Sequence, residues 1–371
     1  MPEKETKDKS DPSDKSDPSD KSDPSDKSDP SDKSDPSDES EQNVKFNIIS
    51  KRKTKKPIGV IQTGPVSMLK IGKYTLDERI GEKEDPIEIK APSYYMNNRE
   101  IFTNFMSSIF GAYKEELKRD AASISCDDNG DSTFSLMTHQ KIVRDYINLY
   151  TPYRGLLLYH GLGSGKTCSS IAIAEGMKTS KKIIVMTPAS LNRNYNEELK
   201  KCGDSLYRKN QYWEFISTVK NPELIEPLSN KLNLSVEHIR KTGGAWLVNI
   251  KKLPNFESLS ASEKASLDEQ LNSMIKYKYT FINYNGLRKE HITTMVKNAE
   301  GNPFEDAVVI IDEAHNFVSR IVNKLGKKET ISGRLYEYLM DAKNAKIVLL
   351  TGTPIINYPN EIGILFNILR G

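Results

Sequence analysis

Three short polar motifs in this 371-residue chain each follow an apolar run, and their side chains are of types that bind phosphate and a divalent metal ion. The motifs are Gly163–Thr167 (GSGKT), Asp312–His315 (DEAH) and Thr351–Pro354 (TGTP). In an open parallel sheet, ligands bind beyond the carboxyl ends of the strands. All three motifs are expected at that edge, where a phosphate-bearing ligand would lie.

The first motif predicts a phosphate-binding loop. Glycine lets backbone N–H groups approach phosphate oxygens closely, and the helix that follows directs its positive dipole end at the same anion. We expect Lys166 to reach the β- and γ-phosphates of ATP and the Thr167 hydroxyl to bind Mg²⁺. His160 stands where the strict loop pattern has its first glycine, so the shorter core carries the prediction. A chance glycine-rich turn is the alternative. The residues expected around the phosphates are Gly161, Gly163, Ser164, Gly165, Lys166 and Thr167.

The second motif would supply the metal ligand and the catalytic base. Asp312 closes a β-branched run and can hold Mg²⁺ through its hydration shell. Glu313 is the candidate base that orients the attacking water. Taken alone, the two carboxylates could be helix caps and His315 a core histidine. When the acidic motif is considered together with Lys166, we interpret His315 as a link between the γ-phosphate site and the rest of the protein.

Five short apolar runs predict the sheet that positions these motifs. Continuous rather than alternating runs suit parallel strands that are covered on both faces, and helical patterns lie between them. The sequence therefore predicts an α/β fold with a doubly wound parallel sheet. The runs are Leu156–Tyr159, Ile183–Met186, Tyr279–Ile282, Val308–Ile311 and Ile347–Leu350.

Several of these segments resemble the motifs of superfamily 2 helicases. Thr187 and Pro188 resemble their nucleic-acid-contacting motif, and Gln140 resembles their adenine-reading glutamine. The third motif resembles the one that couples hydrolysis to strand movement, which would give that role to Thr351, Gly352 and Thr353. As an isolated match it could also be an ordinary β-turn.

A narrower resemblance covers about residues 95–371. The stretches that carry it are similar to ATPases of large DNA viruses, the group of the poxvirus early transcription factor small subunit and nucleoside triphosphatase I. They are Leu157–Thr167, Tyr277–Leu287, Ile310–Phe317 and Leu350–Asn357. The resemblance implies a RecA-like P-loop NTPase domain that uses ATP and Mg²⁺ and contacts nucleic acid, DNA rather than RNA. It also implies a helicase or translocase in viral transcription, with the viral RNA polymerase as a partner.

One departure from that group affects the predicted activity. Superfamily 2 proteins bind ATP between two RecA-like domains, and the second domain brings an arginine finger. Here the third motif is followed closely by Gly371, so we expect a second chain to supply that domain. We also expect the isolated chain to hydrolyse ATP poorly, since such an arginine can be worth 10³–10⁵ in rate. The alternatives are a non-catalytic ATP-binding assembly subunit and a remodeller-like DNA translocase.

Composition divides the chain into a tail and a body. Lys9–Asp38 is five tandem copies of Lys-Ser-Asp-Pro-Ser-Asp, with no apolar residue to bury, so we predict a disordered tail over residues 1–42 whose serines are candidate phosphorylation sites. The tail holds 7 basic and 15 acidic residues, net −8, and the remaining 329 residues hold 47 basic and 36 acidic, net +11. A basic body suits a phosphate-backbone partner. We assign residues 43–130 to an accessory region and 131–371 to the ATP-binding domain.

Other segments give weaker predictions. Residues 204–276 read as a helical insertion that starts a helix at Ser260, with most of its aromatic side chains in a core. Arg99–Arg119 reads as an amphipathic helix that packs its apolar stripe inward. The run Lys51–Lys56 could bind nucleic acid, act as a targeting signal or be a solvated linker. Cys126–Asp131 lacks the pattern of a calcium loop.

The cysteines and the length of the apolar runs indicate in which cellular compartment we expect the protein. Cys126, Cys168 and Cys202 are not expected to form a disulfide framework, and the five histidines show no zinc-ligand spacing. No apolar run approaches the ~18 residues that would cross a bilayer, so we expect no membrane partner. These features predict a reducing intracellular compartment. With the viral resemblance, that means host cytoplasm, viral factory or virion.

Overall fold

The computed structural model describes residues 48–49, 70–81, 88–91, 98–123, 135–161, 163–324 and 330–371, all within one compact unit, Val44–Gly371. Three features of the sequence lie outside the described residues: the repeat tail of residues 1–42, the basic run Lys51–Lys56 and the polar loop Cys126–Asp131. The expectations for these segments therefore stay predictions, as do the boundaries of the accessory region and the ATP-binding domain.

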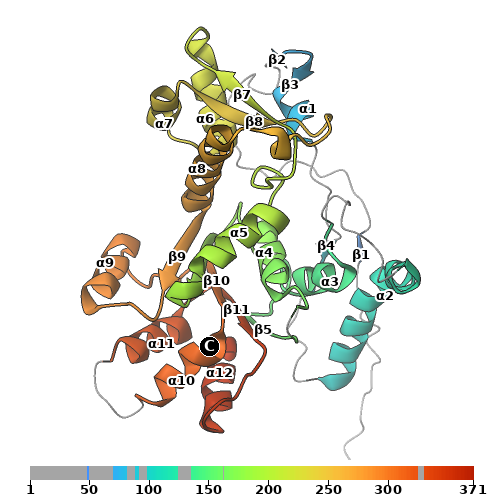
Figure 1. The fold of residues 1–371 in the computed structure, drawn as a ribbon. Coiled ribbons are helices and arrows are strands. Elements are labelled where there is room, and N and C mark those ends of the chain that lie inside the picture. The colour runs from blue at the N-terminus through green and yellow to red at the C-terminus, as the bar shows by residue number, and fades with distance from the viewer. Residues whose placement is uncertain are drawn as a thin grey trace, which may run out of the picture. The chain divides into compact units, whose positions relative to one another are not determined.

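A five-stranded parallel sheet forms the centre of the domain (Figure 1). Its strand order is β5-β11-β10-β6-β9, and each neighbouring pair is parallel. The strands coincide with the five predicted apolar runs: β5 (Gly155–Tyr159), β6 (Lys182–Thr187), β9 (Tyr279–Asn283), β10 (Ala307–Ile311) and β11 (Lys346–Thr351). The predicted α/β fold is thus confirmed.

Two apolar cores cover the two faces of this sheet, which explains why the central strands have no polar face. In β10, Val308 and Ile310 belong to one core, and Val309 and Ile311 to the other. The first core packs against α4 (Lys166–Met177) and α5 (Asn192–Cys202). The second packs against α10 (Ala314–Val322), α11 (Ile331–Asp341) and α12 (Asn360–Arg370), and α9 (Lys289–Ala299) adds Ile292 to it.

Two helices precede the sheet, namely α2 (Arg99–Ser123) and α3 (Thr138–Tyr146). The α2 stripe is buried at Phe105 and Ile109 as predicted, but Phe110 is 47% exposed, because it lies one position beyond the buried face. A hydrogen bond from the Tyr113 hydroxyl to the buried Asp145 joins α2 to α3. The remaining early elements are short: β1 (Ile48–Ile49), β2 (Lys70–Ile71), β3 (Tyr74–Thr75), α1 (Leu76–Ile80) and β4 (Glu88–Ile89).

The insertion between α5 and β9 contains a sheet as well as helices. Strands β7 (Trp213–Ser217) and β8 (Gly244–Val248) pair antiparallel, which corrects the expectation of a purely helical insertion. Three short or medium helices accompany them: α6 (Ile225–Leu232), α7 (Val236–Thr242) and α8 (Ala261–Lys278). Trp213 and Trp246 are buried as predicted, whereas Phe215 is 40% exposed. Ser260 caps α8 through a capping box with Glu263, as the sequence predicted.

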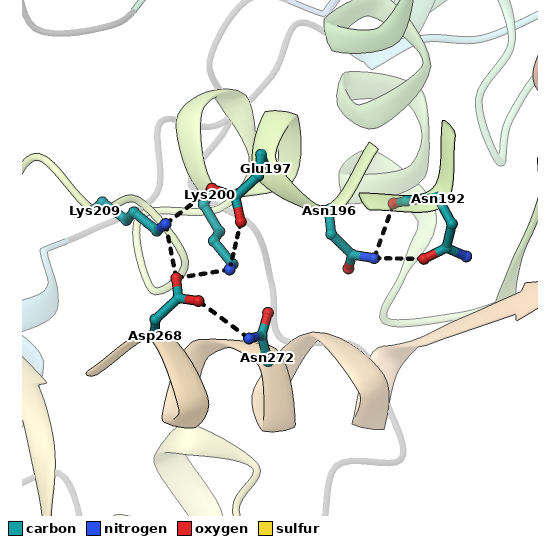
Figure 2. A network of polar contacts seen from close by, with 7 residues as sticks. All are labelled: Asn192, Asn196, Glu197, Lys200, Lys209, Asp268 and Asn272. Carbon is teal, nitrogen blue, oxygen red and sulfur yellow. Dashed lines mark hydrogen bonds and ion pairs between the residues drawn. The ribbon is translucent and has the colours of Figure 1, made fainter. Parts of the chain in front are cut away.

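A charged network ties α8 of the insertion to α5 of the main domain (Figure 2). The Lys200 ammonium, 1% exposed, donates to Glu197 Oε1 at 2.9 Å and to Asp268 Oδ1 at 2.7 Å. Lys209 Nζ lies 2.9 Å from Glu197 Oε2 and 2.7 Å from Asp268 Oδ1. Because both lysines contact both carboxylates, the network holds the insertion at a fixed place on α5.

A disulfide between Cys168 and Cys202 contradicts the sequence-based expectation that the cysteines stay unpaired. Cys168 lies in the first turn of α4 and Cys202 ends α5, and these helices pack side by side with the two Cα atoms 5.7 Å apart. The 34-residue separation gave no sign of this pairing, because it arises from helix packing rather than from spacing. The expectation of a reducing compartment loses this support.

Candidate functional site

The phosphate loop joins β5 to α4 and has the geometry that its glycines allow. Gly163 and Gly165 adopt φ values of 77° and 73°, a left-handed region that favours glycine. Gly165 is the residue from which the twelve-residue α4 starts, so the free N–H groups of the first helical turn face the loop. Ser164 Oγ donates to the Gly161 carbonyl at 2.8 Å and closes the turn.

Lys166 folds back over this loop. Its ammonium donates to the His160 carbonyl at 2.8 Å and to the Gly161 carbonyl at 2.9 Å. A Cβ placed on Gly352 of the third motif would lie 3.9 Å from the same ammonium. The lysine is therefore next to both the first and the third motif.

Gln140 binds the backbone of the phosphate loop through its side-chain amide. It is 3% exposed, donates from Nε2 to the Gly165 carbonyl at 3.3 Å and accepts at Oε1 from the Met137 N–H at 3.1 Å. A Cβ at position 165 would lie 2.5 Å from Nε2, so this contact requires a glycine there. In this conformation the amide braces the loop, and an adenine-reading role for Gln140 remains a prediction.

The acidic motif lies at the carboxyl end of β10. Burial and the charge of Glu313 raise the pKa of Asp312 to about 6, while the nearby Lys166 acts in the opposite direction. Lys166 and Asp312 are thus close enough to interact although 146 positions separate them. Because burial outweighs the compensation from Lys166, this carboxylate suits a divalent cation.

His315 joins the acidic motif to the third motif. Its Nδ1 lies 2.8 Å from Thr351 Oγ1, 3.4 Å from Thr353 Oγ1 and 3.4 Å from Glu313 Oε2. Thr351 is fully buried at the end of β11, and its Oγ1 also accepts from the Thr353 N–H at 3.0 Å. The histidine therefore contacts both the candidate base and the segment predicted to couple hydrolysis to movement.

Two further residues hold loops in place at the carboxyl edge of the sheet, and neither was among the predicted site residues. Glu361 of α12 is fully buried and accepts from the N–H of Ile356 at 2.7 Å and of Asn357 at 3.2 Å, so it fixes the segment after the third motif. Tyr284, which follows β9, contacts the acidic motif directly. A local pattern could not reveal the role of Tyr284, because its partners Asp312 and Glu313 follow another strand, whereas Glu361 binds N–H groups only four and five positions earlier.

The loops after β6 and β9 border an open polar pocket of about 630 Å³ beside the acidic motif. Pro188, Ser190 and Asn285 line it, together with Glu313 and Arg320. Thr187 is fully buried, so a nucleic acid could reach its neighbours here but not its side chain. Of the predicted nucleic-acid-contacting pair, only Pro188 lies at the pocket.

The donor set fits ATP with Mg²⁺. A helix N-terminus, left-handed glycines and a lysine after β5 lie at the same edge of the sheet as a buried carboxylate after β10, with β11 between the two strands, as phosphate and a divalent cation require. Lys166, Thr167 and Asp312 are the residues that would hold the phosphates and the metal ion. A separate cluster of Cys168, Glu198 and Cys202 also brings three potential ligand atoms within 4.8 Å of one another, but its two sulfurs are joined to each other.

Fold and site together define a RecA-like phosphate-loop NTPase domain. Residues 133–356, more than half of the chain, match the family described as type III restriction enzyme, res subunit, and the chain belongs to this family. No helix in the described ranges combines the length and apolarity needed to cross a membrane.

The similar proteins are viral. A protein of Acanthamoeba polyphaga mimivirus, named as an ATP-dependent RNA helicase, is 29% identical over 270 residues, which are 72% of this chain and 38% of the relative. A protein of Invertebrate iridescent virus 3, named as a helicase, is 28% identical over 63% of this chain and 20% of its own length. A termination factor NPH-I homolog of African swine fever virus is 28% identical over 59% of this chain and 22% of its own length.

Among solved structures, the Sulfolobus solfataricus SWI2/SNF2 ATPase core in complex with dsDNA aligns with a TM-score of 0.32 and 15% identity. The alignment covers 66% of this chain and 37% of the Sulfolobus solfataricus chain. The family match and the viral relatives, and not this structural alignment, make the chain a helicase/ATPase-family domain, and it spans less than half the length of those relatives.

Proposed function

We propose that this domain binds ATP·Mg²⁺ at the carboxyl edge of the sheet and hydrolyses it in response to nucleic acid. The observation that carries the proposal is the convergence of Lys166, Asp312 and the His315–Thr351 contact, which come from three separate segments of the chain. ATP supplies the transferable γ-phosphoryl group, and Mg²⁺ neutralises its charge.

The roles follow from geometry. Lys166 would exchange its two carbonyl partners for phosphate oxygens, and Thr167 and Asp312 would hold the metal ion. Glu313, whose side chain is 36% exposed at the pocket, would accept a proton from the attacking water. His315 would relay the state of this site to Thr351 and Thr353 through its contacts with both. In this proposal Gln140 supports the loop, and Pro188 and its neighbours contact the nucleic acid.

The biological setting is part of the proposal. The NPH-I name of one relative supports a role in viral transcription, with the viral RNA polymerase as partner, and the viral relatives support a site of action inside the infected cell or virion. Because other relatives carry the name of RNA helicases, DNA and RNA both have to be tested.

Equilibrium binding of a fluorescent ATP analogue with Mg²⁺ tests the nucleotide site. Lys166→Ala should weaken binding at least about 100-fold, since a charge-assisted contact to phosphate is lost, without changing the thermal melting of the body. Lys201→Ala is the matched control, because Lys201 is 67% exposed and pairs with Glu198 at the surface. Equal affinity for wild type and Lys166→Ala would refute the assignment.

Phosphate release tests turnover. We expect phosphate release from the purified chain to be faster when DNA or RNA is added. Glu313→Gln should abolish release and preserve binding, because it keeps the shape and loses the base. Intact binding without turnover in any complex would instead identify a non-catalytic ATP-binding assembly subunit.

A further inference from the structure

Glu313, the candidate base, has a backbone conformation that costs free energy. Its φ of 48° and ψ of 50° lie in the left-handed region, which is unfavourable for a residue with a side chain. Such a conformation persists only where surrounding contacts impose it. One local contact helps: the Glu313 N–H donates to Asp312 Oδ1 at 3.0 Å. This carboxylate is also the proposed metal ligand, so the turn needs a support that does not depend on it.

Tyr284 provides such a support. Its side chain is 4% exposed, and its hydroxyl lies 3.1 Å from both the Asp312 and the Glu313 carbonyl oxygens, to which it donates. These two carbonyls flank the strained residue. The Tyr284 ring packs edge-on against Phe317 of α10, with centroids 5.5 Å apart, so the hydroxyl is held in place.

The same tyrosine connects the loops that follow three strands. Its N–H donates to the carbonyl of Thr187, the last residue of β6, at 3.3 Å, while its hydroxyl reaches the turn after β10. The next residue, Asn285, lines the polar pocket, and the preceding Asn283 accepts from Asn192 Nδ2 at 3.2 Å. A ligand that moves the loop after β9 therefore acts on the base through one side chain.

We infer that Tyr284 is a positioning residue that holds the Asp312–Glu313 turn in its left-handed conformation, so that nucleic acid at the pocket can bias the catalytic base. The inference rests on the proposed function of Glu313. It assigns no contact between Tyr284 and the nucleotide: the residue acts through the backbone of the acidic motif.

Amide hydrogen exchange of the full chain without nucleotide tests the support directly. Tyr284→Phe keeps the ring and removes the donor. The Asn316 N–H donates at 2.9 Å to the same Glu313 carbonyl that the tyrosine binds. We therefore expect about tenfold faster exchange at the N–H groups of Glu313 and Asn316, as loss of one buried hydrogen bond implies. Tyr279→Phe is the matched control at the start of β9, the strand that Tyr284 follows, because the buried Tyr279 hydroxyl donates to Glu175 at 2.6 Å, away from the acidic motif. Equal exchange at these amides in the Tyr284 variant and wild type would overturn the inference.

Two further readouts separate positioning from general destabilisation. At position 284, 4-aminophenylalanine keeps the ring size and an N–H donor, so exchange should return to within about twofold of wild type. Failure of this rescue would overturn the inference, even if the phenylalanine variant proved unstable. In single-turnover hydrolysis, Tyr284→Phe should lower the rate about tenfold and leave ATP affinity within about twofold. A wild-type chain that bound no ATP would refute the proposed function, whereas the exchange result would stand.

Discussion

Replacing Lys200 with methionine should loosen the attachment of the insertion to the main domain without changing ATP binding. Methionine keeps the aliphatic stem packed and removes only the ammonium. The variant loses the donation to Glu197 at 2.9 Å within α5 and the donation to Asp268 at 2.7 Å, which joins α5 to α8 in Figure 2.

The expected loss of unfolding free energy depends on which ion-pair partners the two carboxylates keep in the variant. Breaking a buried pair and leaving a carboxylate alone costs about 3–5 kcal/mol. Here Glu197 and Asp268 are 41% and 35% exposed, and both keep Lys209, so water and a second ammonium compensate for most of the lost contact. We therefore expect Lys200→Met to lower the free energy of unfolding by about 1–2 kcal/mol.

Urea denaturation of wild type, Lys200→Met, Lys209→Met and the double variant tests whether the two lysines act as one network or as two independent ion pairs. Lys209→Met alone should cost less than Lys200→Met, since Lys209 is 26% exposed and Lys200 is 1% exposed. The double variant should lose more than the sum, by about 1 kcal/mol or more, because neither lysine then covers for the other. Additive losses, or a Lys200→Met protein as stable as wild type, would refute the reasoning.

Four other perturbations have expected outcomes. The pKa of Asp312 is raised to about 6, so between pH 4 and 6 the folded nucleotide-free chain retains a proton that the unfolded chain has lost. The free energy of unfolding should therefore fall as pH rises through this window. Asp312→Asn should flatten this dependence of the unfolding free energy on pH. Glu361→Gln should cost about 1–3 kcal/mol in urea denaturation, because a glutamine that keeps its oxygen on the two backbone N–H groups places its own NH₂ donor against Asn357 Nδ2, which now donates to Glu361 Oε1. Gly155→Ala should reduce the yield of folded chain, since its Cβ would lie within 2.4 Å of the Leu369 carbonyl; a normal circular dichroism melt would contradict this. Deleting residues 1–42 should leave melting temperature and ATP affinity unchanged, because the tail has no apolar surface to bury.

Local pattern was enough to predict the strands and the loops at their ends. Apolar runs with β-branched residues suit strands that are buried on two faces, and the motifs follow them at once, so the sheet and the site edge could be read from neighbouring residues. The Ser260 cap is of the same kind, since its partner Glu263 is only three positions away.

Contacts between distant segments could not be predicted in this way. The Cys168–Cys202 bond, the Lys200–Asp268 pair and the Tyr284 hydroxyl each join elements whose packing a single sequence does not specify. The β7–β8 pair was missed because its strands lie among helical segments that dominated the pattern. For Gln140, the resemblance predicted a nucleotide contact, and only the structure shows the amide bound to the loop backbone.

The strand order also has a consequence for how the chain folds during synthesis. Strand β5 occupies the edge of the sheet, and its neighbour there is β11, which begins at Lys346. At about 5–20 residues per second, roughly 10–40 s pass between translation of the two strands. Throughout that interval the phosphate loop is attached to a strand that has no partner, while β6, β9 and β10 can already be made. The nucleotide site therefore forms among the last parts of the domain, and a nascent chain that binds ATP has completed its sheet.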